Sequence, residues 1–202
     1  MEKKSDSKFK IQDYYYDILY GIETKGYIYL ENKEGYKNYL PTKYLALKKL
    51  FRYLKVNEKD FFVDFGCGLG RVTFCASIAG CGKVLGLDIN PVMYELAQKN
   101  LKNFQLKTKK DTIKIEMADA TKKKITEKMN IFYFYTPFKV EYFKCVIDNI
   151  LESKQNDPRK ITVVTCNTRE EYRSYLENIR LTKKTYFLKS IDGFFFDIYI
   201  FE

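Results

Sequence analysis

Downstream of residue 57, short apolar runs alternate with segments whose apolar residues recur every three or four positions. The runs cover residues 60–66, 83–88, 113–118, 129–135 and 159–166. They end in glycine or polar residues, which is typical of buried strands. The segments between them have the periodicity of helices that cover a sheet. This order predicts a doubly wound, mostly parallel α/β sheet with helices on both faces.

The alternation of strand-like and helix-like segments ends near the carboxyl end of the sequence. Runs at 185–188 and 194–201 flank an Asp192-Gly193 turn and predict a C-terminal antiparallel hairpin. Together with the five preceding strands, the hairpin gives a seven-stranded sheet in which one strand is antiparallel at or beside the edge.

Local chemistry predicts where three helices begin. Asn90 before Pro91 has the pattern of a capped helix start, and Pro41 is typical of a first helical turn. Thr168 and Glu171 have the spacing of a capping box. We therefore expect helices to start at these three points.

Residues 1–57 stand apart from the alternating pattern. They predict an N-terminal helical and aromatic extension that belongs to the same domain as residues 58–202. Within it, Asp13–Asp17 and Tyr20–Thr24 are rich in tyrosine and are interpreted as a lid or a partner surface. The sequence does not decide between these two roles.

Composition narrows the class of protein. The 202 residues are 46% hydrophobic, enough to exclude a disordered chain and to bury one core. No uncharged apolar run approaches the ~20 residues that span a bilayer, and residues 1–10 are polar, which predicts no secretory signal. The five cysteines form no Cys-x-x-Cys pair and indicate thiols in a reducing cytoplasm. With no histidine, the commonest general base and metal ligand is missing, and no metal is expected.

The net charge of +10 has two interpretations. A basic balance is compatible with nucleic acid as a partner. However, 30 of the 36 basic residues are lysines and only 6 are arginines, whereas phosphate recognition usually relies more on arginine. A solvated lysine surface is therefore favoured over an RNA-binding one.

The most informative segment joins the first strand to the next helix. Asp64 precedes three glycines at alternate positions, Gly66, Gly68 and Gly70. Glycine lets the backbone turn tightly and lie against a ligand, and the following helix start offers unpaired N–H groups. Asp88 ends the next strand, eighteen residues after Gly70, where an acid can accept hydrogen bonds from both hydroxyls of a ribose. Together these features predict a nucleoside cofactor.

The glycine spacing indicates which cofactor. Dinucleotide-binding domains carry Gly-x-Gly-x-x-Gly, whereas this chain carries Asp-x-Gly-x-Gly-x-Gly. In this motif, its strand order and its terminal hairpin, the sequence resembles the class I (Rossmann-like) S-adenosylmethionine-dependent methyltransferases over residues 58–202. The resemblance implies S-adenosyl-L-methionine as cofactor and S-adenosyl-L-homocysteine as product.

The resemblance also implies site residues. The loop from Asp64 to Gly70 would contact the methionine part of the cofactor, Asp88 the ribose and Ile89 the adenine, while Asp119 would approach the adenine amine. The segment from Tyr135 to Phe138 would close over cofactor and target atom. The implied cofactor-binding set is Asp64, Phe65, Gly66, Cys67, Gly68, Gly70, Asp88, Ile89, Asn90, Asp119, Ala120, Tyr135, Thr136 and Pro137.

Catalysis then requires that the methyl acceptor be aligned with the methyl group, that water be excluded and that one proton be removed from the acceptor. Without histidine, the candidates for the proton are Tyr39, Tyr135 and Asp119, and a metal-independent mechanism is expected. Enzymes that methylate adenine, cytosine or glutamine amines resemble one another in an Asn/Asp/Ser-Pro-Pro-aromatic motif. The aligned Tyr135-Thr136-Pro137-Phe138 lacks the first residue of that motif, which disfavours base N-methylation.

Three functions remain open at this point. The first is a methyltransferase that acts on a protein side chain or a small metabolite. The second is an RNA methyltransferase, which predicts lysines beside the pocket, with Lys122, Lys123 and Lys124 as the first suspects. The third is a protein that binds S-adenosylmethionine without turning it over. Neither the methyl acceptor nor the oligomeric state can be read from the sequence.

Overall fold

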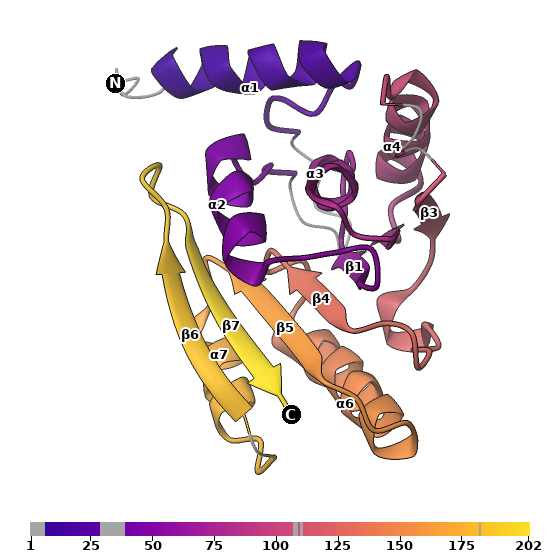
Figure 1. Ribbon diagram of the computed structural model, residues 1–202, viewed down its shortest axis with the longest axis vertical. Coiled ribbons are helices and arrows are strands. Elements are labelled where there is room, and N and C mark those ends of the chain that lie inside the picture. The colour runs from indigo at the N-terminus through magenta and orange to yellow at the C-terminus, as the bar shows by residue number, and fades with distance from the viewer. Residues whose placement is uncertain (1–6, 29–38, 107–108, 110, 182) are drawn as a thin grey trace.

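A seven-stranded sheet forms the centre of the molecule (Figure 1). The computed structural model describes residues 7–28, 39–106, 109, 111–181 and 183–202. The strand order is β3-β2-β1-β4-β5-β7-β6. The strands are β1 (Phe61–Phe65), β2 (Lys83–Asp88), β3 (Ile113–Met117), β4 (Ile131–Phe134), β5 (Ile161–Cys166), β6 (Lys183–Lys189) and β7 (Phe195–Phe201).

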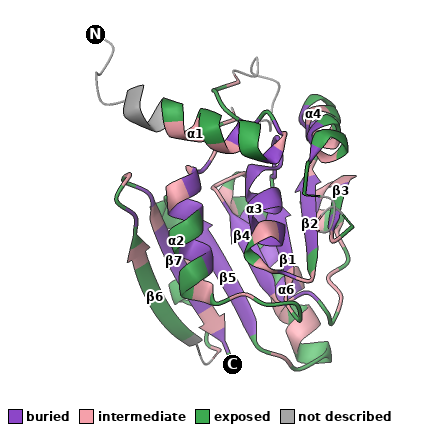
Figure 2. Ribbon diagram, turned by 45° about the horizontal axis from the view of Figure 1, so that its top comes forward, coloured by how far each residue is buried: buried purple, intermediate pink, exposed green. Residues whose placement is uncertain are grey.

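The pairing confirms the predicted fold class. Strands β3, β2, β1, β4 and β5 pair in parallel. Strand β7 runs antiparallel between β5 and β6, so the one reversed strand lies beside the edge. The edge strand β6 is largely exposed, whereas the central strands are buried (Figure 2). The sheet therefore has the predicted order, with the hairpin attached to β5.

Helices cover both faces of the sheet and enclose two hydrophobic cores. One core takes Leu47 from α2, Phe74 from α3 and Ala97 from α4, and the other takes Ile147 from α6 and Leu176 from α7. Alternate residues of the central strands supply the two cores, as Phe132 and Tyr133 of β4 do, because side chains alternate along a strand. The helices are α1 (Ser7–Tyr20), α2 (Tyr44–Leu54), α3 (Arg71–Ala79), α4 (Pro91–Asn103), η1 (Ala120–Lys122), α6 (Val140–Asn156) and α7 (Glu170–Glu177).

One predicted helix start is confirmed and two are wrong. The Asn90 side chain accepts hydrogen bonds from the backbone N–H groups of Val92 and Met93, so it caps α4. Helix α2 begins at Tyr44 with Lys43 as its N-cap, beyond Pro41. Helix α7 begins at Glu170 after Arg169. The Thr168 hydroxyl is hydrogen-bonded to the Thr165 hydroxyl (2.7 Å), and no side-chain hydrogen bond caps α7.

The described part of the N-terminal segment packs onto the sheet domain. Tyr20, Ile22 and Tyr44 are buried in the same core as α3 and α4. An isolated bridge joins Ile28 to Tyr39 and brings the chain back toward the glycine loop. The rest of the predicted extension, residues 1–6 and 29–38, lies outside the described residues. In the described part of the chain, no helix has the length and apolar character needed to cross a bilayer.

Candidate active site

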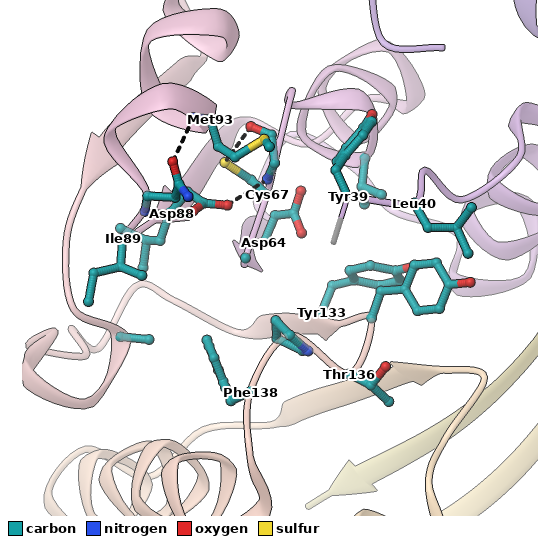
Figure 3. Close-up of a pocket in the computed structure, with 18 of the residues that line it drawn as sticks. Tyr39, Leu40, Asp64, Cys67, Asp88, Ile89, Met93, Tyr133, Thr136 and Phe138 are labelled. Atoms are coloured by element: carbon teal, nitrogen blue, oxygen red, sulfur yellow. Dashed lines mark hydrogen bonds between the residues drawn. The ribbon is translucent and has the colours of Figure 1, made fainter. Parts of the chain in front are cut away.

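A cavity of about 810 Å³ opens at the carboxyl ends of β1, β2 and β4. Parallel strands end at the same edge, and this is where ligands bind in open α/β sheets. In the view of Figure 3, Asp88 and Ile89 lie at one end and Tyr39 and Leu40 at the other, with Asp64 between them. The cavity is lined by Tyr27, Tyr39, Leu40, Pro41, Thr42, Asp64, Gly66, Cys67, Gly68, Arg71, Val72, Leu87, Asp88, Ile89, Asn90, Met93, Ala118, Asp119, Ala120, Thr121, Tyr133, Tyr135, Thr136, Pro137, Phe138, Tyr142, Asn167 and Arg169.

The glycine loop follows directly from β1 and is fixed by its backbone. The N–H groups of Gly66 and Cys67 donate to the Leu87 carbonyl at 2.8 and 2.9 Å. Gly68 has φ of 54°, and a Cβ there would lie 2.5 Å from the Tyr39 ring. Only glycine fits a left-handed turn that is covered so closely. The loop therefore forms one wall of the cavity, with Tyr39 lying against it.

Asp88 connects the end of β2 to this loop. The Gly68 N–H donates to its Oδ2 and the Asn90 N–H to its Oδ1, both at 2.9 Å. Burial raises the pKa of Asp88, and hydrogen bonds from the Asn90, Gly68 and Ile89 backbone oppose the rise. A carboxylate has about four acceptor positions, so the bonds from Gly68 and Asn90 do not exhaust its capacity for a ligand's hydroxyls.

Asp64 is a buried acid in the floor of the cavity, with 2% of its surface exposed. The Thr73 hydroxyl donates to its Oδ2 at 2.9 Å. Burial raises the pKa of Asp64 to about 7; the Thr73 bond lowers it and the nearby Asp88 raises it further. A cation that enters the cavity would favour the ionised form.

The Tyr39 hydroxyl is hydrogen-bonded within the protein. The hydroxyl donates to the Thr24 carbonyl at 2.8 Å. Burial raises the pKa of Tyr39, and the neighbouring Arg71 opposes this shift. A tyrosine whose pKa is raised stays protonated, and a protonated tyrosine is a poor proton acceptor. The hydrogen bond and the raised pKa therefore favour Tyr39 as a wall of the cavity over Tyr39 as a proton acceptor.

The opposite wall is aromatic and comes from the ends of β4 and β5. The Asn167 amide donates to the Tyr135 hydroxyl (3.2 Å), and the Tyr135 ring meets Phe194 edge-on at 5.9 Å. Burial raises the pKa of Tyr135 to about 12. Thr136 and Asn167 have φ of 40° and 46°, a conformation rare for residues other than glycine. Backbone strain of this kind gathers at ligand sites.

Asp119 has its carboxylate largely occupied by local structure. Its Oδ1 accepts bonds from the Thr121 N–H (3.0 Å) and hydroxyl (2.7 Å), so it caps η1. Lys122 lies 3.7 Å from its other oxygen. The Thr121 hydroxyl bond is the main reason that the pKa of Asp119 is lowered. A carboxylate with a lowered pKa is a weak base, although Asp119 still lines the cavity.

The structure brings most of the predicted residues together. Two members of the predicted cofactor-binding set do not line the cavity. Phe65 is one residue further along β1 than Asp64, so its ring points to the other core and stacks on Phe134 at 4.9 Å. Gly70 caps α3, and a Cβ there would meet the Phe74 ring. Lining residues absent from the predicted set include Thr42, Arg71, Met93, Tyr133, Tyr142, Asn167 and Arg169.

The lysines around the cavity and the possible metal ligands are two points on which the sequence makes predictions. No lysine is among the described residues that line the cavity. Of the three lysines singled out for RNA, Lys122 pairs with Asp119 and Lys123 with Glu116. Among the residues that the structure describes, no group of three or more His, Cys, Asp or Glu side chains is placed to hold a metal ion.

This sheet order, glycine loop and strand-end acid define a class I (Rossmann-like) methyltransferase fold. The solved structures that share it include three proteins of different origin. They are human methyltransferase 10 domain containing protein (13% identity, TM-score 0.65, 96% of each chain), precorrin-6y C5,15-methyltransferase from Geobacter metallireducens (15%, 0.63, 87% of this chain and 98% of that one) and an RNA methyltransferase from Salinibacter ruber in complex with S-adenosyl-L-homocysteine (18%, 0.55, 80% and 92%).

A family model matches most of the sequence. The chain belongs to the family described as conserved hypothetical protein 95, whose model matches residues 29–191. It is also 36% identical, over 75 residues, to a demethylmenaquinone methyltransferase from Lactobacillus johnsonii. That match covers 36% of this chain and 30% of the relative, so less than a third of the relative's length is represented. Family and fold together place the chain in the class I methyltransferase superfamily.

Proposed function

We propose that this chain is an S-adenosylmethionine-dependent methyltransferase that transfers a methyl group, without a metal, to a protein side chain or a small metabolite. The observation that carries the proposal is the hydrogen bond from the Gly68 N–H to Asp88 Oδ2. It joins the glycine loop and the strand-end acid in one cavity, where a nucleoside's hydroxyls would meet the carboxylate.

The residues present fit such a cofactor. Gly66, Cys67 and Gly68 offer a close backbone wall, Asp88 offers acceptors for a ribose, and the half-exposed Ile89 offers an apolar surface for a base. The cavity volume of about 810 Å³ lies within the range of ligand sites, ≈ 300–1,000 Å³. When bound, S-adenosylmethionine supplies an activated methyl group on a sulfonium.

The protein's task is then to orient and to exclude water. Tyr39, Tyr133 and Phe138 wall the cavity with aromatic rings, and the Thr42 and Tyr133 hydroxyls are hydrogen-bonded at 2.8 Å. The ionised form of Asp64 would favour a cationic ligand. Because Asn167 donates to the Tyr135 oxygen, the Tyr135 O–H proton is free to point to another acceptor. Tyr135 is therefore the group best placed to orient a methyl acceptor.

The lining favours a compact acceptor over a nucleic acid. Among the described residues that line the cavity, many are aromatic and the basic ones are Arg71 and Arg169, whereas an RNA site would need a lysine-rich lining. Lys123 forms an ion pair with Glu116, whereas Lys122 is exposed and lies 3.7 Å from Asp119. The net charge of +10 keeps RNA as the second candidate, and the experiment below separates the two.

The first measurement is calorimetric titration of the chain with S-adenosyl-L-homocysteine. The second is transfer of labelled methyl groups from S-adenosylmethionine into a cell lysate, divided into protease-sensitive, nuclease-sensitive and low-molecular-weight label. Label in the protein or small-molecule fraction supports the proposal, and label in the nuclease-sensitive fraction overturns its substrate class. Binding of S-adenosyl-L-homocysteine without transfer of label identifies a non-catalytic binder. If the folded protein does not bind S-adenosyl-L-homocysteine, the cofactor assignment is overturned.

A further inference from the structure

Helix α1 carries an apolar face that is exposed to solvent. Five large apolar side chains of this helix are between 47% and 71% exposed: Ile11, Tyr14, Tyr15, Ile18 and Leu19. Spacings of three, four and seven residues place them on one side of a helix. Among the described residues, no other helix or strand carries more than two exposed large apolar side chains. Exposed apolar side chains grouped in this way mark an interaction surface.

The opposite side of α1 anchors the helix to the protein. Asp17 is buried and accepts hydrogen bonds from the Thr24 N–H (2.8 Å) and the Tyr44 hydroxyl (2.6 Å). Asp13 forms an ion pair with the buried Arg71 at 3.0 Å. These two residues are the only acids in the sequence of α1. Because both are used on the inner side, the outer face carries no negative charge of its own.

Lysines border the apolar face. Lys25 Nζ lies 4.0 Å from the centre of the Tyr14 ring. A hollow of about 270 Å³ between α1 and α4 is lined by Lys25 and Lys99, and the exposed acid in it is Glu23. Lys48, exposed on α2, contacts α1 from another element. Lysine stems can lie along an apolar surface while their charged ends reach beyond it. The surroundings of the face therefore favour a partner that is apolar and negatively charged.

We propose that the outer face of α1 docks onto an anionic lipid surface. Tyrosine rings and aliphatic side chains bordered by lysine are the composition of a helix that lies in the plane of a membrane interface. The tyrosine-rich segment Asp13–Asp17, which the sequence leaves as a lid or a partner surface, is then a partner surface. The helix lies across the end of the molecule toward which β4 and β5 point (Figure 1), and the cavity opens at that same end.

Two other occupants of the face fit less well. A stable protein interface buries ~800 Å² on each partner. Residues 11–20 of α1 form a face only about 15 Å long and about 10 Å wide. A second copy of this chain would also bring its own net charge of +10 against the same lysines. A lipid surface needs no matching contour, and it supplies both apolar contact and the opposite charge.

The test is co-flotation of the full chain with vesicles of phosphatidylcholine and phosphatidylserine, compared with vesicles of phosphatidylcholine alone. Wild-type protein should float with the anionic vesicles, and less of it should float as salt is raised. Ile11→Ser/Ile18→Ser should lower the partition coefficient about 10-fold or more, because two apolar side chains leave the interface. The matched control is Val92→Ser/Phe187→Ser, which removes side chains of similar exposure (53% and 61%) from α4 and β6. It should float as wild-type protein does.

A second pair of variants tests the charge. Lys25→Gln/Lys99→Gln should lower partition into anionic vesicles roughly 10-fold or more, the effect of two lysines near an anionic surface. Lys128→Gln/Lys160→Gln removes the same charge shortly before β4 and β5, at the other end of these strands, and should have little effect.

A spectroscopic probe reports on the face directly. The chain has no tryptophan, so Tyr15→Trp provides a single reporter. Its emission should shift to shorter wavelength when anionic vesicles are added, whereas the emission of Tyr186→Trp, on β6, should not.

The outcomes are distinct, and none depends on methyl transfer. Wild-type protein that does not float with anionic vesicles overturns the proposal, and so does Ile11→Ser/Ile18→Ser that floats as wild-type protein does. A dimer in light scattering that this variant converts to a monomer would assign the face to a second copy. A monomer that does not float would assign it to a different protein. Should circular dichroism show that the variant does not fold, Lys25→Gln/Lys99→Gln and Tyr15→Trp decide.

Discussion

The two long walls of the cavity are built differently. The wall formed by the ends of β1 and β2 is held by backbone groups, with the Gly66 and Cys67 N–H groups on the Leu87 carbonyl and the Gly68 N–H on Asp88. The wall formed by the ends of β4 and β5 adds side-chain contacts, as between the Asn167 amide and the Tyr135 hydroxyl, to a backbone bond from the Asn167 N–H to the Phe195 carbonyl. Its residues Thr136 and Asn167 have positive φ. The first wall therefore depends on main-chain groups and one acid, whereas the second depends more on its side chains.

This difference suggests a division of labour. A wall made of main chain and one acid can bind the cofactor with few side chains. A wall made of strained, aromatic residues is where a chain adapts to its own substrate, because fold does not dictate substrate. Changes in the first wall should alter cofactor binding, and changes in the second should alter transfer with little effect on the cofactor.

The largest effect is expected from Gly68→Val. A Cβ at Gly68 already lies 2.5 Å from the Tyr39 ring, so a branched side chain must displace that ring or fill the cavity. Overpacking of this kind costs up to ~3 kcal/mol, equivalent to roughly 100-fold in cofactor affinity. Calorimetric titration with S-adenosyl-L-homocysteine measures the loss.

The control for this variant is Gly193→Val. Gly193 has a similar positive φ of 86°, but a Cβ there meets nothing within 4 Å and the residue does not line the cavity. It reproduces the backbone strain of the substitution without the obstruction. If Gly68→Val binds the cofactor as wild-type protein does, the glycine loop does not contact the cofactor and the two walls do not differ in the proposed way.

Asp88→Ala should have the next largest effect. The substitution removes the acceptor proposed for the ribose and frees the Gly68 N–H, so affinity for S-adenosyl-L-homocysteine should fall about 10- to 100-fold. Asp119→Ala is the comparison, because Asp119 Oδ1 is occupied by Thr121. The loss of affinity in Asp119→Ala should be smaller than in Asp88→Ala. An equal loss in the two variants would show that the two acids contribute alike.

The first wall was predictable because its determinants are local. Left-handed glycines and an acid at a strand end follow from a few neighbouring residues, and Gly66, Gly68 and Asp88 line the cavity as the sequence indicated. Phe65 shows the limit of carrying over a whole segment. Side chains alternate along a strand, so the residue next to Asp64 faces the other core.

The second wall and Arg71 depend on contacts between distant parts of the chain. The Thr42 and Tyr133 hydroxyls are 91 residues apart in sequence, and Arg71 meets Thr24 across 47 residues. No periodicity encodes such pairs. Tyr133 has the pattern of a core strand residue, and its contribution to the cavity appears only once β4 lies beside β1. The fold class was therefore accessible from the sequence, whereas the acceptor side of the site was not.

Asp64 allows the first wall to be tested by pH. Its pKa of about 7 in the folded chain, against 3.8 ordinarily, means that the folded state holds a proton between pH 4 and 7 that the unfolded state lacks. Stability of the free domain should therefore fall as pH rises through this window. Cationic S-adenosylmethionine favours the ionised form, so its affinity should rise about 10-fold from pH 6 to pH 8.

The matched variant is Asp64→Asn, which can still accept the Thr73 hydroxyl. The affinity of this variant for the cofactor should be independent of pH between 6 and 8. Its free energy of unfolding should no longer fall between pH 4 and 7. Calorimetry in buffers of different ionisation enthalpy should detect proton release on binding to wild-type protein at pH 6 and none in the variant. A pH dependence that survives in Asp64→Asn would assign the titration to another group.

The smallest effect on the cofactor is expected from Tyr135→Phe. The substitution keeps the ring against Phe194 and removes only the hydroxyl that Asn167 contacts, so affinity for S-adenosyl-L-homocysteine should change less than about 3-fold. Methyl transfer to the labelled lysate fraction should nevertheless fall roughly 10-fold, the value of one hydrogen bond to the acceptor. Tyr186→Phe, on the exposed edge strand, is the control and should change neither quantity. Equal losses of binding and transfer in Tyr135→Phe would mean that the β4–β5 wall also holds the cofactor, and the division of labour between the walls would not stand.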